Sequence, residues 1–206
     1  MTGMTHLPPP DSLERLFQSL ALLDAIMSPE WEYRYYSFDA HWGPGETMGS
    51  MRNGSGDSLF ALFNDHGCFL KGFSHEHQAD HLGAEAFYKH VPEDFAVGVV
   101  EPAFSPNNVT FCYWRRRNDG EWNDSGVELS KGDDPDGSAF LLLGLDGKPE
   151  TYQAFACEYY EAEVPLDPVA AIFAHGRLTE DIVRALNPEI SIERLQADIA
   201  EIGYGV

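Results

Sequence analysis

The hydrophobic pattern of this chain changes its period near Trp31 and again at the segment KGDDPDG, residues 131–137, and these changes limit the folds that the sequence can form. Between the two places, apolar and aromatic residues gather mainly in short runs that glycine-rich turns separate. This pattern is typical of strands joined by hairpins. After the segment, apolar residues recur every three or four positions, as on the buried face of a helix. The pattern predicts an α+β fold: an N-terminal helix and a mixed, largely antiparallel sheet with hairpins, followed by an all-helical, acidic C-terminal part.

The N-terminal helix is predicted for residues 11–27, where apolar side chains follow helical spacing. Asp11 is a suitable N-cap with Glu14 as its capping-box partner, and Pro29 ends the helix. Asp24 falls beside the apolar stripe. We therefore expect Asp24 at the edge of the helix, facing water.

The strand predictions rest on alternating or continuous apolar runs between turn residues. The predicted strands are residues 36–42, 58–63, 68–73 and 109–114, with 121–129 pairing back as the next strand. The turn NDHG joins the second and third of them as a hairpin. Residues 77–90 have helical spacing and are predicted to form a helix.

The segment KGDDPDG is also the best candidate for a boundary. Residues 1–130 are predicted to form an α+β sheet domain and residues 131–206 a helical subdomain packed on it, with a single domain as the alternative. In the second part, Pro149 marks a helix start, and Thr179 and Ser191 are the predicted N-caps of two later helices.

The charge of the chain is strongly negative, with 34 acidic residues against 13 Lys and Arg and a formal net charge of -21. Residues 1–117 hold 15 acids and 8 bases, a net -7, so the remainder carries -14. A surface of this sign repels nucleic acid and anionic lipids, and we expect neither as a partner. It suits a basic protein partner or a cation, although charge also serves solubility.

The cysteines and the chain start indicate a reducing compartment. The chain has an odd number of cysteines, Cys68, Cys112 and Cys157, and they form no CxxC motif. Their neighbours in the sequence are apolar, which favours buried free thiols. No apolar run has the length of a membrane span, and residues 1–10 lack the features of a signal peptide. We therefore expect a cytoplasmic protein.

Three histidines within seven residues form the densest group of titratable side chains. His75 and His77 share one side of an extended segment, and His77 and His81 share one face of a helix. The three are therefore a candidate site for zinc or another divalent metal, with Glu76, Asp80 or the more distant His90 as a fourth ligand. No other cofactor is expected. The alternative is a hydrated turn that leads into a helix.

The glycine-rich stretch GPGETMGSMRNGSG, residues 43–56, is a second candidate site. Trp42, Arg52 and Asn53 bracket it and are the candidate binding residues, because glycines permit close approach of a ligand and Arg52 can hold an anion. The stretch matches neither a P-loop nor a dinucleotide fingerprint. The alternative is a connection between strands.

A basic triplet, residues 115–117, ends the strand TFCYWRRR. A single triplet in so acidic a chain does not form a nucleic-acid footprint. We expect these arginines to protect an edge strand or to pair with the acidic C-terminal helices.

Two stretches carry a resemblance to known proteins. WEYRYYSFDAHWGPGETMGSMRNGSGDSLFALFNDHGCFLKGFSHE and ALNPEISIERLQADIAEIGY resemble a family of bacterial proteins with no assigned activity. The resemblance covers most of the chain and implies a fold and a bacterial source. In size, acidity and texture the chain is also similar to immunity proteins of bacterial toxin systems, from which no residue role is carried over.

These observations favour an acidic, immunity-like protein that binds a basic partner, and no catalytic residue is assigned. Two alternatives stay open. One is a metal-dependent hydrolase at His75, His77 and His81, and the other is a small-ligand-binding regulatory domain near Trp42.

Overall fold

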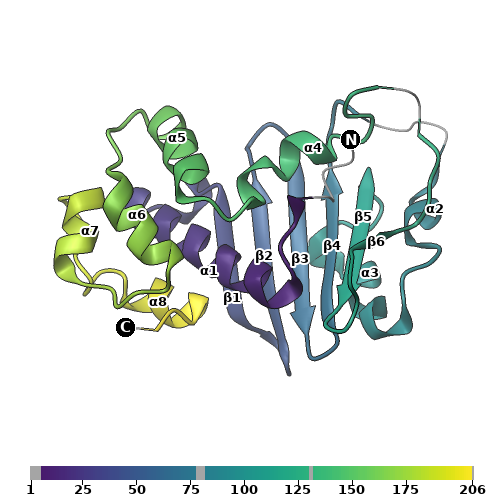
Figure 1. The fold of residues 1–206 in the computed structure, drawn as a ribbon, viewed down its shortest axis with the longest axis horizontal. Helices are drawn as coiled ribbons and strands as arrows, with labels where there is room; N and C mark the ends of the chain where they lie inside the picture. The colour runs from purple at the N-terminus through teal and green to yellow at the C-terminus, as the bar shows by residue number, and fades with distance from the viewer. Residues whose placement is uncertain (1–5, 78–81, 130–131, 206) are drawn as a thin grey trace.

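The computed structural model describes residues 6–77, 82–129 and 132–205. Within these ranges, one antiparallel sheet has its strands in chain order. The strands are β1 (Tyr36–Gly43), β2 (Glu46–Arg52), β3 (Ser58–Asn64), β4 (Gly67–Phe73), β5 (Phe111–Arg116) and β6 (Asn123–Asp124). The α-helices are α1 (Pro10–Met27), α2 (Ala84–Tyr88), α3 (Ala96–Val100), α4 (Ser138–Leu141), α5 (Pro149–Tyr159), α6 (Leu166–Phe173), α7 (Glu180–Leu186) and α8 (Gln196–Ile202). Short 3-10 turns are η2 (Trp31–Tyr33), η3 (Glu93–Phe95), η4 (Pro102–Phe104) and η5 (Leu143–Leu145). This arrangement confirms the α+β prediction (Figure 1).

Most strand predictions are confirmed, and the differences have local causes. The glycine-rich stretch 43–56 contains β2 between two turns. The interpretation of this stretch as a connection between strands missed β2. Gly49 of β2 lets helix α1 approach the sheet, because a Cβ there would lie 2.5 Å from Cγ of Phe17. The predicted strand 121–129 is reduced to the two residues of β6. Of the helix predicted for residues 77–90, residues 78–81 lie outside the described ranges, and among the described residues only α2 is helical.

One face of the sheet is covered by α1, with α6, α7 and α8 packed against that helix (Figure 1). Buried apolar side chains from the sheet, α1 and the C-terminal helices form one continuous cluster, which includes Phe17, Tyr36, Tyr152 and Ile199. The helical part and the sheet therefore share a core. We call this side the closed face.

Asp24 lies inside this core, so the prediction that it faces water is wrong. Its side chain is 0% exposed, and its carboxylate accepts hydrogen bonds from the Tyr36 backbone N–H at 2.6 Å and the Tyr152 hydroxyl at 2.7 Å. Burial raises the pKa of Asp24 to about 6. The physical reason is that α1 is enclosed by the sheet and by the C-terminal helices, so residues beside its apolar stripe are buried as well.

The helix caps agree with the sequence in one case and differ in two. Thr179 caps α7 as predicted, accepting a hydrogen bond from the Ile182 N–H at 3.3 Å. The predicted capping box of Asp11 and Glu14 is wrong: α1 begins at Pro10 after Pro9, without a side-chain cap. Glu14 accepts instead from the Thr47 hydroxyl of β2 at 2.7 Å.

The predicted Ser191 cap is wrong as well. Helix α8 begins at Gln196 after the N-cap Leu195, without a side-chain cap. Residues 192–195 form turns rather than a helical start. The apolar pattern therefore begins before the regular helix does.

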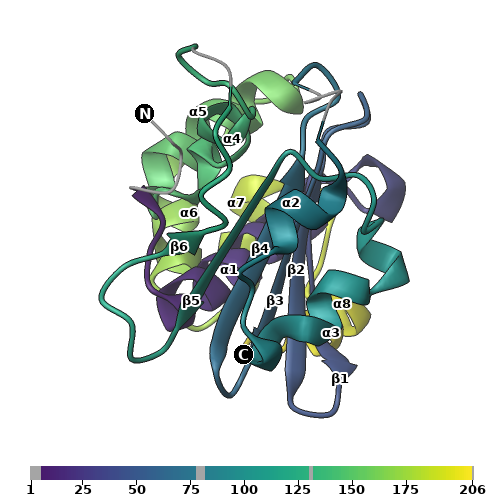
Figure 2. The same cartoon turned by 90° about the vertical axis from the view of Figure 1, so that its right-hand side faces the viewer.

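The opposite face of the sheet is only half covered. Helices α2 and α3 lie on the other side of the sheet from α5 and α6 (Figure 2), over a second apolar cluster that includes Leu62, Phe69 and Phe104. At the margin of this cover Lys71 is buried, and its Nζ donates to the carbonyl oxygens of Phe104 at 2.6 Å, Ser105 at 3.0 Å and Asn108 at 2.5 Å. We call this side the open face, because a groove lies there over β1 and β2.

The basic triplet does not meet the acidic C-terminal helices, and that expectation is wrong. Arg116 pairs with Asp94 at 2.7 Å, and Arg117 pairs with Asp11. Strand β5 lies at the far side of the sheet from α6 to α8, which explains the difference (Figure 1).

The cysteines are free, as predicted: Cys68 and Cys112 are buried, and Cys157 is half-buried. In the described ranges, no helix has the length and apolarity needed to cross a membrane.

Candidate functional site

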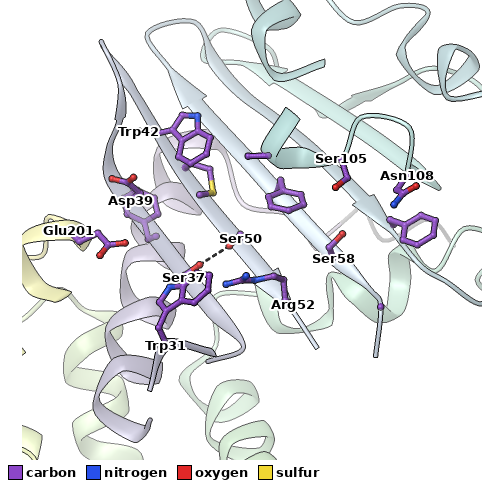
Figure 3. Close-up of a pocket in the computed structure, with 16 residues that line it drawn as sticks. Trp31, Ser37, Asp39, Trp42, Ser50, Arg52, Ser58, Ser105, Asn108 and Glu201 are labelled. Carbon is purple, nitrogen blue, oxygen red and sulfur yellow. Dashed lines mark hydrogen bonds between the residues drawn. The ribbon is translucent and has the colours of Figure 1, made fainter. Parts of the chain in front are cut away.

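A groove of about 530 Å³ lies on the open face, over β1, β2 and β3. It brings together Trp42 and Arg52, two of the three predicted binding residues, with Trp31 of η2 (Figure 3). Every second residue of β2 from Met48 to Arg52 lines the groove, because side chains alternate across a strand, and Ser37 and Asp39 of β1 line it in the same way. The pairing of β1 is irregular between Asp39 and Gly43, and Trp42 lines the groove out of this alternation.

Small hydroxyl side chains form the floor of the groove. The hydroxyls of Ser37 in β1 and Ser50 in β2 are hydrogen-bonded at 2.7 Å (Figure 3), and Ser58 of β3 also lines the groove. Serines are too small to fill the space above the sheet, so the groove stays open. Their hydroxyls can donate or accept hydrogen bonds.

Two aromatic rings, Trp42 and Phe60, form one wall of the groove, which we call the aromatic wall. Both are stacked on the buried Phe104 ring behind them, with centroids 5.6 Å and 4.9 Å from it and interplanar angles of 20° and 17°. Trp42 and Phe60 are half-buried and line the groove. The stacking holds a flat apolar surface in place.

Arg52 lies at the other end of the groove, against Trp31. Its guanidinium carbon is 3.9 Å from the centroid of the Trp31 ring, which is cation–π geometry. Burial lowers the pKa of Arg52, and no carboxylate of the described residues raises it. The guanidinium still stays charged, because an arginine side chain does not lose its proton in the neutral range, and its N–H donors can bind an anionic ligand.

Two carboxylates, Asp39 of β1 and Glu201 of α8, border the groove on its α8 side (Figure 3). The pKa of Glu201 is raised, first by partial burial and then by Asp39 and Asp198. Arg34 and His41 are the groups that lower the pKa of Glu201. One side of the groove is therefore negative, and Arg52 is the positive group on its margin.

Asn53, the third predicted binding residue, does not line the groove. Its side-chain amide donates to the Asp57 carboxylate at 2.6 Å, and its side-chain oxygen accepts from the Ser55 N–H at 2.9 Å. Asn53 thus closes the turn between β2 and β3 and supports the position of Arg52.

The histidine patch is divided between separate partners. Nδ1 of His75 lies 2.7 Å from Asp57, and Nδ1 of His77 lies 2.8 Å from the Ser74 hydroxyl. Among the described residues, no group of three or more His, Cys, Asp or Glu is arranged to hold a metal ion. His81 lies outside the described residues, so the three-histidine metal site stays a prediction.

A second hollow, of about 520 Å³, lies on the other side of η2 and carries exposed aromatic rings. Tyr33 is 60% exposed and Tyr159 of α5 is 40% exposed, and both line the hollow. Four exposed carboxylates adjoin these two tyrosines in the chain: Glu30, Glu32, Glu158 and Glu161. We call these six residues the tyrosine surface.

Trp31, Phe60 and the tyrosine surface were not among the predicted site residues. The alternation of polar Ser37 and Asp39 with apolar Phe38 along β1 does indicate a polar sheet face. It does not indicate that η2 and α8 border this face, because that depends on contacts between distant segments.

Comparison with known proteins finds no relative of this chain. The chain matches no model of a protein family, and neither a curated protein nor a solved structure is significantly similar to it. Functional inference therefore depends on the groove and the tyrosine surface.

Proposed function

We propose that the protein is an acidic binding protein, of the immunity type, that docks a basic protein partner on the tyrosine surface. The observation that carries this proposal is the pair of exposed rings, Tyr33 and Tyr159, beside a hollow, with four exposed carboxylates within three positions of them in the chain. Exposed aromatic rings are the side chains that most often dominate binding at protein interfaces.

The ring of Tyr159 is held in place before any partner arrives. It is stacked on Phe155 with centroids 5.1 Å apart, and it packs edge-on against Tyr35 at 5.4 Å. Its hydroxyl donates to the backbone carbonyl of Tyr33 at 3.4 Å, which links α5 to η2. A fixed ring loses little conformational entropy on binding, and this favours its use as an anchor.

The charge around these rings suits a basic partner. The pKa of Tyr33 is raised, and the main cause is the negative charge of Glu32 and Glu30. Glu158 and Glu161 are exposed on the α5 side, and Glu163 and Asp167 follow them in the connection to α6 and its first turn. A negative field of this kind increases the association rate of a positively charged protein.

The acidic surface extends beyond the tyrosine surface. Exposed carboxylates occur on α5, α7 and α8 and in the connections between helices, rather than on one helix face. This spread supports long-range attraction of a basic partner, while the two tyrosines supply the specific contact. The proposed setting is the bacterial cytoplasm, where reducing conditions keep Cys68 and Cys112 as thiols.

The test begins with capture of partners by the full chain from the producing bacterium at low and at high salt. Binding of each captured protein is then measured after its purification. We expect a basic protein whose affinity falls steeply as salt rises, and whose binding is weakened on the order of a hundredfold by a Tyr33→Ser, Tyr159→Ser double variant.

Matched controls separate this surface from general acidity. Phe140→Ser removes an exposed ring 64% accessible on α4, and Asp181→Lys reverses an exposed charge on α7. Both should leave the affinity within about threefold of the original value, whereas Glu32→Lys should reduce it on the order of tenfold. A partner that is lost equally in the controls, or the absence of any basic partner, would contradict the proposal.

A further inference from the structure

The groove on the open face has features that docking at the tyrosine surface does not use. Its volume of about 530 Å³ is in the range of small-molecule sites. The groove lies on one side of η2, and Trp31 lines it. The tyrosine surface lies largely on the other side, and Tyr33 lines the hollow there. The two can therefore be altered separately.

The positive group of the groove has no counter-charge within the described residues. Arg52 is half-buried against Trp31, and burial is the cause that lowers its pKa. In a chain with 34 acidic residues, an arginine in this position would readily pair if a carboxylate were within reach. Asp39 and Glu201 lie toward α8 instead, where Arg34 and His41 act on Glu201. An incoming anion would supply the missing charge.

The apolar part of the groove is flat and fixed. Trp42 and Phe60 present half-buried rings, and both are stacked on the buried Phe104. Met48 of β2 also lines the groove, with a flexible thioether that packs well against aromatic rings. A planar aromatic group can stack on this wall in the way that aromatic side chains stack on one another.

The number of charges on the ligand is limited by the acidic side of the groove. Asp39 and Glu201 repel a second anionic group, so a singly charged carboxylate is favoured over a phosphate that carries close to two charges. The serine hydroxyls on the floor, Ser37 and Ser50, can bind a carboxylate oxygen or a ring N–H.

From these features we propose that the groove binds a small aromatic monocarboxylate, with its carboxylate on Arg52 and its ring against Trp42 and Phe60. The ligand is a free small molecule rather than the end of a polypeptide. Binding at this groove is independent of the partner docked at the tyrosine surface.

The experiment is calorimetric titration of the full chain with indole-3-acetate, with neutral indole, and with a hexapeptide that ends in tryptophan. We expect saturable binding of indole-3-acetate, and affinity lower on the order of tenfold for indole, which lacks the carboxylate. Arg52→Gln should weaken indole-3-acetate binding to a similar extent. The matched control Arg194→Gln, on an exposed arginine before α8, should leave it unchanged.

A second variant tests the aromatic wall without touching the charge. Trp42→Leu should reduce affinity for indole-3-acetate while a thermal melt shows the fold retained. Equal affinity for indole and its carboxylate, binding unaffected by Arg52→Gln, tighter binding of the peptide than of the free acid, or no saturation at millimolar concentration would each overturn the inference. Tyr33→Ser, Tyr159→Ser protein should still bind indole-3-acetate, so failure at one surface leaves the other testable.

Discussion

Polar side chains on the two sides of the sheet differ in burial and in hydrogen bonding. On the closed face, Asp24 is fully buried and satisfied by the Tyr36 N–H and the Tyr152 hydroxyl. On the open face, Arg52 is half-buried, stacked on Trp31, and without a carboxylate partner among the described residues. A polar group that is internally satisfied contributes to stability, whereas one left with free donors is suited to binding.

Lys71 lies between these extremes. It is on the open face but under its covered half, and its Nζ donates to three backbone carbonyl oxygens. Desolvation lowers the pKa of Lys71 to about 8. The difference between Lys71 and Arg52 shows that the cover of η4, rather than the face of the sheet, decides which cation is structural.

The largest effect is expected from Asp24→Ala. The substitution leaves the Tyr36 N–H and the Tyr152 hydroxyl buried without an acceptor, and should lower the free energy of unfolding by about 4 kcal/mol. Urea denaturation measures this. Asp24→Asn keeps one acceptor oxygen and should lose less than half as much. A loss below about 1 kcal/mol in Asp24→Ala would show that the closed face does not depend on this carboxylate.

The next effect concerns pH. The pKa of Asp24 is about 6 in the folded protein against an ordinary 3.8, so between these values the folded state holds more protons than the unfolded state. The free energy of unfolding therefore falls as pH rises from about 4 to about 6, by about 3 kcal/mol relative to Asp24→Asn. Denaturation of both proteins across this range isolates the contribution. Parallel pH profiles would contradict it.

The smallest effects come from the two cations of the open face. Lys71→Met leaves three carbonyl oxygens without their donor and should lower the free energy of unfolding by about 2 kcal/mol. Arg52→Met removes a half-buried guanidinium that has no acceptor among the described residues, and it should change the free energy of unfolding by less than about 0.5 kcal/mol. Equal losses in the two variants would remove the distinction between a structural and a binding cation.

Much of the fold was predictable because its signals are local. The helix 11–27, the hairpin around NDHG and the cap Thr179 follow from spacing and turn residues within a few positions. Strand β2 was missed because its glycines and serines imitate a connection, and its role depends on the close approach of Phe17 from α1.

Trp42 and Arg52 were predictable candidates because they flank a glycine-rich stretch, and the structure places both in one groove. Asn53 has the same sequence position but points into its own turn, toward Asp57. Sequence spacing alone does not separate these two outcomes, because they depend on where the strand ends: Arg52 is the last residue of β2, and Asn53 lies in the turn that follows it.

Neighbouring residues and composition were enough to predict the N-terminal helix, the alternation in most strands and the excess of carboxylates. Tertiary contacts set three other features: Asp24 is buried, β1, β2 and α8 border one groove, and Tyr33 meets Tyr159. Those outcomes depend on contacts between segments far apart in the chain. A local pattern shows which side of an element is apolar, but the packing of distant elements decides what covers it.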